Sequence, residues 1–305
     1  MLAPSIEADH RICRNILAQG SRSFALASRL LPPELARASA ALYAFCRVAD
    51  DAIDEATDPV ASLAALYARV DGIFLGCPGD DPVDRAFAAV VARHRLPRPI
   101  VDALIEGFAW DVAERRYRTM EELLTYCARV ASTVGVLMTL LVGERRPSML
   151  ARAADLGLAM QLTNIARDVG EDARAGRVYL PLELLEQAGL DPQRFMDDPQ
   201  PSPAIAQIVE QLLDRAEHYY RRADEGIIGL PRSVRLGIGT ARLVYAAIGA
   251  RIRAAGGDSV SQRRFVPLWR KLLLGLRALT YLGPQGSGGA APPDPATVFL
   301  VRGSV

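Results

Sequence analysis

The stretch QLTNIARDVGEDARAGRVY, residues 161 to 179, decides the fold class of this 305-residue chain. Residues three or four apart share one face of an α-helix. The polar side chains at that spacing, which we call the second polar face, are Gln161, Asn164, Asp168 and Asp172. The other positions of this helix are mainly apolar, which predicts burial. Polar groups on a buried helix need partners, so the stretch predicts a site as well as a helix.

A second helix, predicted at residues 34 to 55, carries a matching polar face. Its members, spaced four, three and four residues apart and called here the first polar face, are Tyr43, Arg47, Asp50 and Asp54. The plain alternative is a solvated helix end with a routine Arg–Asp pair. A single D-x-x-x-D occurs by chance in many helices, so two such faces are more specific than one.

Acids massed on two helices repel each other unless cations neutralise them. Mg²⁺ prefers oxygen ligands and bridges carboxylates to substrate phosphates. Arginines suit diphosphate oxygens directly, and those near the acids are Arg47, Arg167, Arg174 and Arg177. The two polar faces together therefore predict a clamp for a diphosphate and its metal ions.

The rest of the chain predicts an all-α fold. Prolines end helices, and the long intervals between them are rich in Ala, Leu, Arg and Glu. Alternating β-branched runs are scarce, so no strand is required. Further helices are expected at residues 9 to 29 and 60 to 96 (two pieces each), 99 to 143 (split at a Thr119 capping box), 204 to 227, 233 to 255 and 264 to 282. Residues 1 to 282 are assigned to one domain, and residues 283 to 305, rich in Gly, Pro and Ala, to a disordered tail.

Composition narrows the function. Lys plus Arg (36) nearly balances Asp plus Glu (35), so a nucleic-acid partner held by bulk charge is not expected. The four cysteines are far apart, which predicts reduced thiols and no zinc site. The three histidines are scattered and predict ordinary surface or capping positions.

No targeting segment is recognisable. The N-terminus lacks a signal-peptide pattern, and the longest weakly charged stretch, residues 236 to 250, is too short to span a membrane and contains Arg242. We therefore expect a cytoplasmic protein without a transmembrane helix. Peripheral membrane contact stays open.

Small residues interrupt the first predicted helix at residues 20 to 24, GSRSF. Hydroxyls, backbone N–H groups and a cation at a helix start suit an anion, so Ser21, Arg22 and Ser23 are candidate phosphate contacts. The alternative is a Ser N-cap. Residues 131 to 135 are also small and predict close approach of a neighbouring helix or a long apolar ligand. Asp111 is a candidate helper of the site, with a solvent-facing acid as the alternative.

Four strings, in this order, resemble the squalene/phytoene synthase family, most closely its bacterial phytoene-forming branch. They are SRSFALASRLLP (21 to 32), LYAFCRVADDAIDE (42 to 55), YCARVASTVG (126 to 135) and QLTNIARDVGEDARAGRVYLP (161 to 181). The resemblance implies a single all-α isoprenoid synthase fold with a central cavity. It also implies Mg²⁺, or Mn²⁺, bound between two aspartate-rich motifs and prenyl diphosphates.

The same resemblance implies a reaction. Two geranylgeranyl diphosphates condense head to head through a cyclopropyl diphosphate to phytoene, and diphosphate is released. The matching metal-binding and catalytic residues are Asp50, Asp54, Asp168 and Asp172, with Tyr43 and Arg47 as further catalytic residues. The matching substrate contacts are Ser21, Arg22, Ser23, Gln161, Asn164 and Arg167, the cavity-wall tyrosines Tyr126, Tyr179 and Tyr245, and, as a weaker match, Arg264.

Two alternatives remain at this stage. One is a dehydrosqualene or squalene synthase that uses farnesyl diphosphate, because cavity depth sets chain length and one sequence does not reveal it. The other is a non-catalytic helical assembly factor, which all four aspartates disfavour. No G-x-G-x-x-G follows a strand, so neither ATP nor NADPH is expected. Expected partners are prenyl diphosphates, the inner membrane surface because the product is oily, and other carotenoid enzymes.

Overall fold

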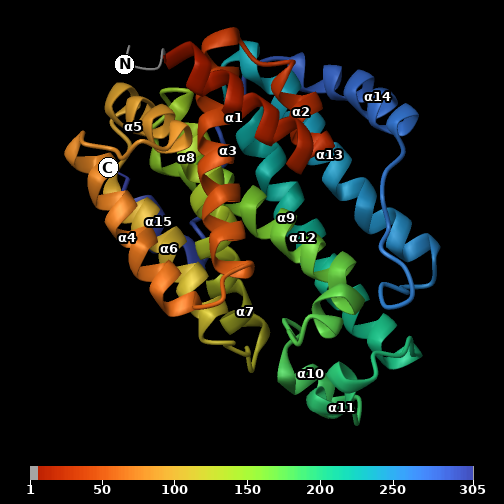
Figure 1. The fold of residues 1–305 in the computed structure, drawn as a ribbon. Helices are drawn as coiled ribbons and strands as arrows, with labels where there is room; N and C mark the ends of the chain where they lie inside the picture. Colours follow the sequence, from red (N-terminus) through yellow and green to blue (C-terminus); the bar gives the residue numbers. More distant parts are fainter. Residues whose placement is uncertain (1–5, 305) are drawn as a thin grey trace.

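The computed structural model describes residues 6 to 304, and every regular element among them is a helix (Figure 1). The elements of the first half are α1 (Ile6–Gly20), α2 (Arg22–Ser28), α3 (Pro33–Asp54), α4 (Pro59–Leu75), α5 (Pro82–His94), α6 (Arg98–Val112), α7 (Met120–Cys127), the π-helical turn η1 (Ala128–Ser132) and α8 (Thr133–Leu141). Those of the second half are α9 (Pro147–Arg174), α10 (Leu182–Gln187), α11 (Pro192–Asp197), α12 (Pro203–Ile227), α13 (Arg232–Ala254), α14 (Leu268–Arg277), η2 (Ala278–Leu282), η3 (Pro295–Thr297) and α15 (Val298–Arg302). The all-α prediction is confirmed.

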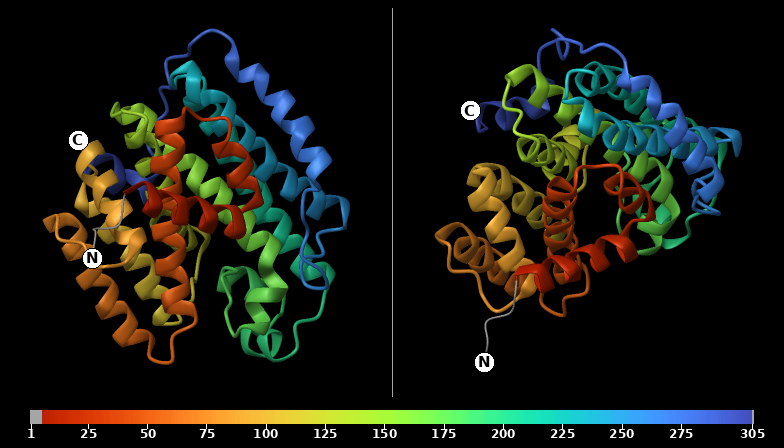
Figure 2. Two further views of the ribbon diagram at one scale, coloured as in Figure 1. Left: turned by 45° about the horizontal axis from the view of Figure 1, so that its top comes forward. Right: turned by 90° about the horizontal axis from the view of Figure 1, so that it is seen from above.

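Helix α9 is the centre of the bundle. It packs against α12, α13, α8 and η1. Leu150 and Ala154 in its first half belong to one apolar core, and Leu162 and Val169 in its second half belong to another. Seen from above, α1 to α3, α9 and α13 surround the middle of the molecule (Figure 2). The helix that carries the second polar face is therefore buried, as its apolar positions predicted.

Glycines allow α8 and η1 to approach α9 closely. A Cβ atom at Gly157 would lie 2.4 Å from Ser132 Cα, and one at Gly135 would lie 2.5 Å from Ala153 O. Neither position has room for a side chain. In the same contact, Ser132 Oγ donates a hydrogen bond of 2.7 Å to Ala154 O. The close approach predicted for residues 131 to 135 is confirmed.

One buried helix has the length of a membrane span. The continuous helix Met120–Leu141 has 22 residues and a hydropathy of 1.5, and it is the one helix of residues 6 to 304 that could cross a membrane by length and composition. However, 61% of the most apolar 18-residue stretch of this helix is buried inside the bundle, where the helix contacts α6 and α9. Core helices of folded domains pass the same test, so its packing identifies it as part of the core.

The prediction of a disordered tail is wrong for residues 283 to 304; Val305 lies outside the described residues. Leu300 of α15 is fully buried, and α15 packs on α9. Arg222 Nη2 donates to Pro292 O over 2.7 Å, and Tyr219 Oη donates to Asp294 Oδ2 over 2.7 Å. Composition indicated disorder because Gly and Pro supply little core. The partners that order this segment lie on α12, far away in the sequence.

The last long helix begins later than predicted. Residues 258 to 267 form a loop, and α14 begins at Leu268 directly after Pro267, whose ring fixes a helix start. All four cysteines are free thiols. None of the three histidines lines the cavity described below.

Candidate active site

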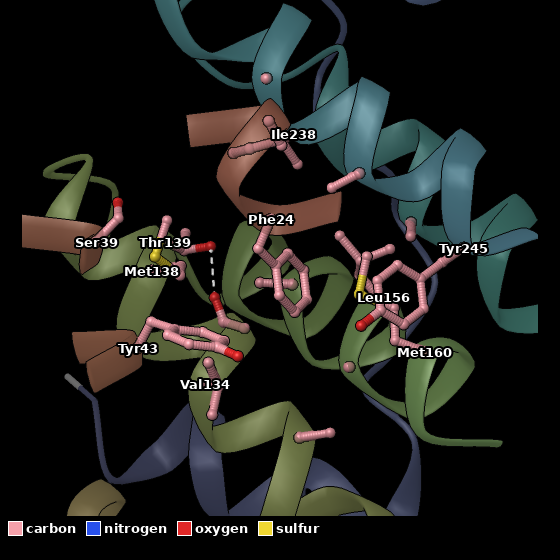
Figure 3. A pocket seen from close by; sticks show the side chains of 18 of the residues that line it. Phe24, Ser39, Tyr43, Val134, Met138, Thr139, Leu156, Met160, Ile238 and Tyr245 are labelled. Carbon is pink, nitrogen blue, oxygen red and sulfur yellow. Dashed lines mark hydrogen bonds between the residues drawn. The ribbon is translucent and has the colours of Figure 1, made fainter. Parts of the chain in front are cut away.

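An apolar cavity of about 310 Å³ lies between α1, α2, α3, η1, α8, α9, α12 and α13. Side chains from three sides of the bundle point into it (Figure 3). Those labelled in the figure include Phe24, Tyr43, Met138, Leu156, Met160, Ile238 and Tyr245. The hydroxyl groups of Thr139 and Ser39 are used locally, because Thr139 Oγ1 donates to Gly135 O and Ser39 Oγ donates to Leu35 O. The lining is therefore suited to a long hydrocarbon.

Three aromatic rings lie together at one side of this cavity. Phe24 lies between Tyr43 and Tyr245 in Figure 3. Its ring stacks on Tyr245 at a centroid distance of 5.2 Å and meets Tyr43 edge-on at 6.1 Å. Burial raises the pKa of Tyr245 to about 12, so this phenol stays neutral at physiological pH. The predictions of Tyr43 as a site residue and Tyr245 as a cavity-wall residue agree with these positions.

The GSRSF break lies against the first polar face. A Cβ atom at Gly20 would lie 2.5 Å from Tyr43 Oη, so a side chain at this position would displace the Tyr43 ring. Ser21 Oγ accepts a hydrogen bond of 3.2 Å from Phe24 N and caps α2. The N-cap alternative is therefore correct for Ser21. Phosphate contacts from Ser21, exposed Arg22 and half-buried Ser23 stay a prediction.

The first polar face begins at the cavity and ends at the exposed end of α3. Arg47 pairs mainly with Asp51, at 2.6 Å, and approaches Asp50 at 3.6 Å. Burial and the neighbouring charge of Asp54 raise the pKa of Asp50 to about 6. Asp50 is therefore an acid whose charge is poorly compensated in the protein alone.

The second polar face begins inside the cavity. Gln161 and Asn164 line it, and Asn164 Nδ2 donates to Gln161 Oε1 over 3.3 Å. Asn164 Oδ1 is buried and has no hydrogen-bond partner. Asp168 lies one turn further along α9, and Asp172 lies two turns further. Burial and the charge of Asp168 raise the pKa of Asp172 to about 7. Within residues 6 to 304, the Asp172 carboxylate forms no ion pair.

Two arginines hold Asp168. Arg167 Nη2 lies 2.6 Å from Asp168 Oδ2, and Arg263 Nε lies 2.8 Å from Asp168 Oδ1. The sequence pointed to Arg264, but Arg264 Nη1 donates to Gln262 Oε1 instead. Two consecutive arginines in a loop leave an ambiguity of one residue, and the structure places Arg263 at the second polar face.

Arg177 joins the two polar faces. Its Nη2 atom lies 2.7 Å from Asp54 Oδ1 on α3. Its backbone N–H donates to Asp172 O over 2.8 Å in the turn that ends α9. The chain reverses at Gly176, which has a φ of 75°. By contrast Arg174, also a sequence candidate for the diphosphate, donates to Val260 O over 2.7 Å and holds a loop.

Asp111 belongs to the same charged cluster. Tyr126 Oη and Tyr179 Oη donate to its two carboxylate oxygens over 3.0 and 2.9 Å. Burial raises the pKa of Asp111 to about 6. The charge of Arg177 lowers this pKa, and the charge of Asp54 raises it. The helper interpretation of Asp111 is favoured over the solvent-facing one. Tyr126 and Tyr179, predicted on the cavity wall, instead position this acid.

These acids do not form a complete metal site by themselves. Among residues 6 to 304, no group of three or more His, Cys, Asp or Glu side chains could hold a metal ion. The residues nevertheless fit a hard cation, because carboxylates with raised pKa and the unpartnered Asn164 Oδ1 are oxygen ligands that lack positive charge. A cation here would complete its coordination with water or ligand phosphate oxygens.

The fold and the site define an all-α protein with an apolar cavity whose mouth carries acids and arginines. Such a site is suited to a ligand with an anionic head and a long apolar chain. Residues 17–270 match the squalene/phytoene synthase family. The chain belongs to that family, as its sequence motifs predicted.

Similar proteins support the same assignment. The chain is 46% identical to the phytoene synthase of Rhodobacter capsulatus, across 97% of this chain and 89% of that one. It is 38% identical to the 15-cis-phytoene synthase of Pantoea ananas, across 93% and 94%. A crystal structure of a dehydrosqualene synthase in complex with ligand superposes with a TM-score of 0.84 at 30% identity, across 91% and 97%. The isoprenoid synthase fold is confirmed.

Proposed function

We propose that this protein is a phytoene synthase, which joins two geranylgeranyl diphosphates head to head and releases diphosphate. The observation that carries the proposal is the 46% identity to a phytoene synthase across nearly the whole chain. The likeness to the dehydrosqualene synthase is lower, at 30% identity. The C20 substrate is therefore preferred over the C15 alternative, and a non-catalytic role is disfavoured.

The charged mouth would bind the diphosphate heads. Arg177 and Arg167 offer planar guanidinium groups that match phosphate oxygens. Each now pairs with a carboxylate, Arg177 with Asp54 and Arg167 with Asp168. A diphosphate that enters with its metal ions can take over these pairings, because the carboxylates then turn to the metal. Each arginine would then exchange its carboxylate partner for a phosphate oxygen of the substrate and would not be left unpaired.

Mg²⁺, with Mn²⁺ as the alternative, would be held by Asp50, Asp54, Asp168 and Asp172. When bound, it neutralises the negative charge that develops on the leaving diphosphate. Asn164 on the second polar face is a fifth candidate ligand, through its unpartnered Oδ1. The raised pKa of Asp50 and Asp172 supports this assignment, since both acids need positive charge to be fully ionised at neutral pH.

The cavity would hold the prenyl chains and protect the allylic cations that follow ionisation. Its apolar lining excludes water, which would otherwise capture a cation. The rings of Phe24, Tyr43 and Tyr245 present π-faces that stabilise positive charge. Tyr245 is buried and neutral, so it contributes a ring and a hydroxyl dipole rather than a charge.

The remaining predictions belong to the same proposal. We expect no need for NADPH or ATP. We place the enzyme at the cytoplasmic side of the inner membrane, because substrate and product are both oily, and next to other carotenoid enzymes that consume the product. No nucleic acid takes part.

Product analysis tests the proposal. The purified protein is incubated with Mg²⁺ and either geranylgeranyl or farnesyl diphosphate, with and without NADPH, and the hydrocarbon is identified by mass spectrometry. A C40 triene-centred hydrocarbon without NADPH supports phytoene synthesis, and EDTA should abolish it. Product from the C15 substrate alone would replace the proposal with the dehydrosqualene alternative.

A further inference from the structure

Helix α14 carries an apolar surface that the rest of the protein leaves uncovered. The surface has six side chains, five from α14 and Leu279 from the following turn η2, which together we call the α14 surface and which are each between 50% and 66% exposed: Leu268, Trp269, Leu272, Leu273, Leu276 and Leu279. Phe265 in the preceding loop, 62% exposed, extends it. The other large apolar side chains that are exposed in the described chain are scattered over α1, α4 and α15. This surface is therefore a local concentration and not the ordinary scatter of exposed leucines.

The geometry of α14 explains why one helix is apolar on two sides. Leu274 of α14 and Ala278 at the start of η2, four residues apart, face inward, where both elements pack against α13. At about 100° per residue, the six residues of the α14 surface fall on the opposite side of the helix. Figure 1 shows α14 on the outside of the bundle, next to α13. Because its inner face already anchors the helix, the outer leucines and Trp269 are not needed for folding.

The charge around this surface is positive. Between Asp258 and Asp294 the sequence has no acidic residue. The cations in that interval are Arg263, Arg264, Arg270, Lys271 and Arg277. Arg270 and Arg277 are seven residues apart, so they lie along one edge of the apolar face, and Lys271 lies toward the other edge. An apolar face bordered by cations is the pattern of a helix that lies in a membrane interface.

A second copy of the protein fits this surface less well. Two copies that met through α14 would bring two sets of cations together with no acid from the same segment to pair them. The ten residues of α14 also offer a small area compared with the roughly 800 Å² per partner of a stable interface. An anionic bilayer matches both the apolar face and the cations that border it.

We propose that the α14 surface docks this protein onto an anionic lipid bilayer. Helix α13 then lies between the bilayer and the cavity, since α13 contacts α14 and its Ile238, Ala241 and Tyr245 line the cavity. The surface thus holds the cavity within one helix of the lipid phase. Its biological sense rests on the proposed function, which handles oily molecules, but lipid binding itself is measured without any substrate.

Vesicle flotation tests the proposal. The full chain is mixed at low ionic strength with vesicles of phosphatidylcholine and phosphatidylglycerol in equal parts, and the bound fraction is measured. The variant Leu272→Gln/Leu276→Gln should bind at least about tenfold more weakly, because two apolar side chains no longer enter the interface. Arg270→Gln/Arg277→Gln should lose about fivefold per cation, and pure phosphatidylcholine should weaken wild-type binding in the same way.

A matched control separates this surface from general stickiness. Val60→Gln/Leu75→Gln removes two apolar side chains from α4 that are even more exposed, at 69% and 77%, and should bind vesicles like wild type. All three variants should keep wild-type melting temperatures and wild-type turnover of detergent-solubilised substrate. Trp269 fluorescence should shift to the blue on vesicle addition, and Trp269→Phe should lose that shift.

Three results would overturn the inference. They are no binding of the wild type to anionic vesicles, equal binding by Leu272→Gln/Leu276→Gln, or a wild-type dimer in light scattering that this variant dissolves. Vesicle binding with no turnover of any prenyl diphosphate would instead remove the proposed function and leave the docking surface in place.

Discussion

The first and second polar faces carry aspartates at the same spacing on α3 and α9, yet their surroundings differ. On α9, Asp168 is only 17% exposed and is fixed by Arg167 and Arg263. On α3, Asp54 is 40% exposed and has one arginine, Arg177, which comes from the turn after α9. The second face is therefore arranged before any ligand binds. The first face sits at an exposed helix end and depends on the second for its partner.

A further difference lies within each face. One acid of each pair is held by arginine, namely Asp54 and Asp168. The other, Asp50 or Asp172, has a raised pKa. Like spacing therefore does not mean like roles. The arginine-held acids orient the mouth, and the acids with raised pKa are the ones that most need a metal ion.

The largest expected effect on turnover comes from replacing the acid with raised pKa on each polar face. Asp50→Asn and Asp172→Asn should each lower turnover about 10³-fold, because each removes a ligand for the ion that stabilises the leaving diphosphate. Initial rates of product formation measure this. Glu55→Gln, which changes an exposed acid next to Asp54, is the control and should be neutral.

Folding is the necessary check on that result. In the metal-free protein, ionised Asp50 and Asp172 are unfavourable, so the asparagine variants should melt no lower than wild type. A variant that loses both helicity and activity would say nothing about metal binding. Wild-type rates in both variants would refute the role of these acids.

The second expected effect is the pH dependence of Mg²⁺ affinity. The metal must displace a proton from Asp172 below about pH 7 and from Asp50 below about pH 6. Affinity should therefore fall about 100-fold in total between about pH 8 and pH 5.5, at up to tenfold per pH unit per proton. Calorimetric titration measures it. In Asp172→Asn, most of the fall between pH 8 and 6 should disappear.

The same shifts fix the sign for stability. A carboxyl whose pKa is raised on folding favours the folded state below its unfolded pKa near 4, and this contribution is lost as pH rises through about 6 and 7. The free energy of unfolding contributed by these two acids in the metal-free protein should therefore decrease across that window. Mg²⁺ should restore it. Melting curves with EDTA and with Mg²⁺ compare the two states, and a metal-free melting temperature that rises through the window would argue against the assignment.

The third prediction concerns Arg177, whose ion pair with Asp54 joins the two polar faces. Arg177→Gln should reduce kcat/KM by about 10- to 100-fold, since a hydrogen bond between charged groups contributes about 1.5 to 3 kcal/mol. Arg174→Gln is the matched control three residues earlier. It should lower the melting temperature because Arg174 holds Val260 O, while kcat/KM changes little. A larger kinetic effect at Arg174 than at Arg177 would reverse the assignment.

The smallest expected effect on kcat/KM comes from the arginines near the second polar face. Arg263→Gln should lower kcat/KM about fivefold, because Asp168 keeps Arg167 as a partner and Arg263 is one-third exposed. Arg264→Gln should have less effect, since Arg264 does not contact an acid of either face in the structure. Measuring both variants decides which of the two consecutive arginines serves the site.

Most of the fold could be predicted because helical spacing and proline positions act locally. Helices α3, α12 and α13 begin and end within two residues of the predicted bounds. The tail could not be predicted. Its backbone is ordered by hydrogen bonds from Arg222 and Tyr219, and no local pattern in residues 283 to 304 records those partners.

The site divides in the same way. Spacing identified the four aspartates because residues on one helix face have a fixed geometry. It could not identify Arg263 or the Asp111 cluster, because their neighbours are set by loops and by helix packing. Tyr126 and Tyr179 were assigned to the cavity wall, and only the positions of α6, α7 and the loop after α9 reveal that both bond to Asp111.

The π-helical turn η1 has a consequence of its own. One helix contributes Tyr126 to the Asp111 cluster at its start and Ala131, Val134 and Met138 to the cavity further along. An uninterrupted α-helix keeps one set of residues on one side, whereas a π turn inserts a residue and rotates everything after it. The π turn therefore shifts the register of the helix, so that one continuous helix contributes side chains to both the charged cluster around Asp111 and the apolar cavity.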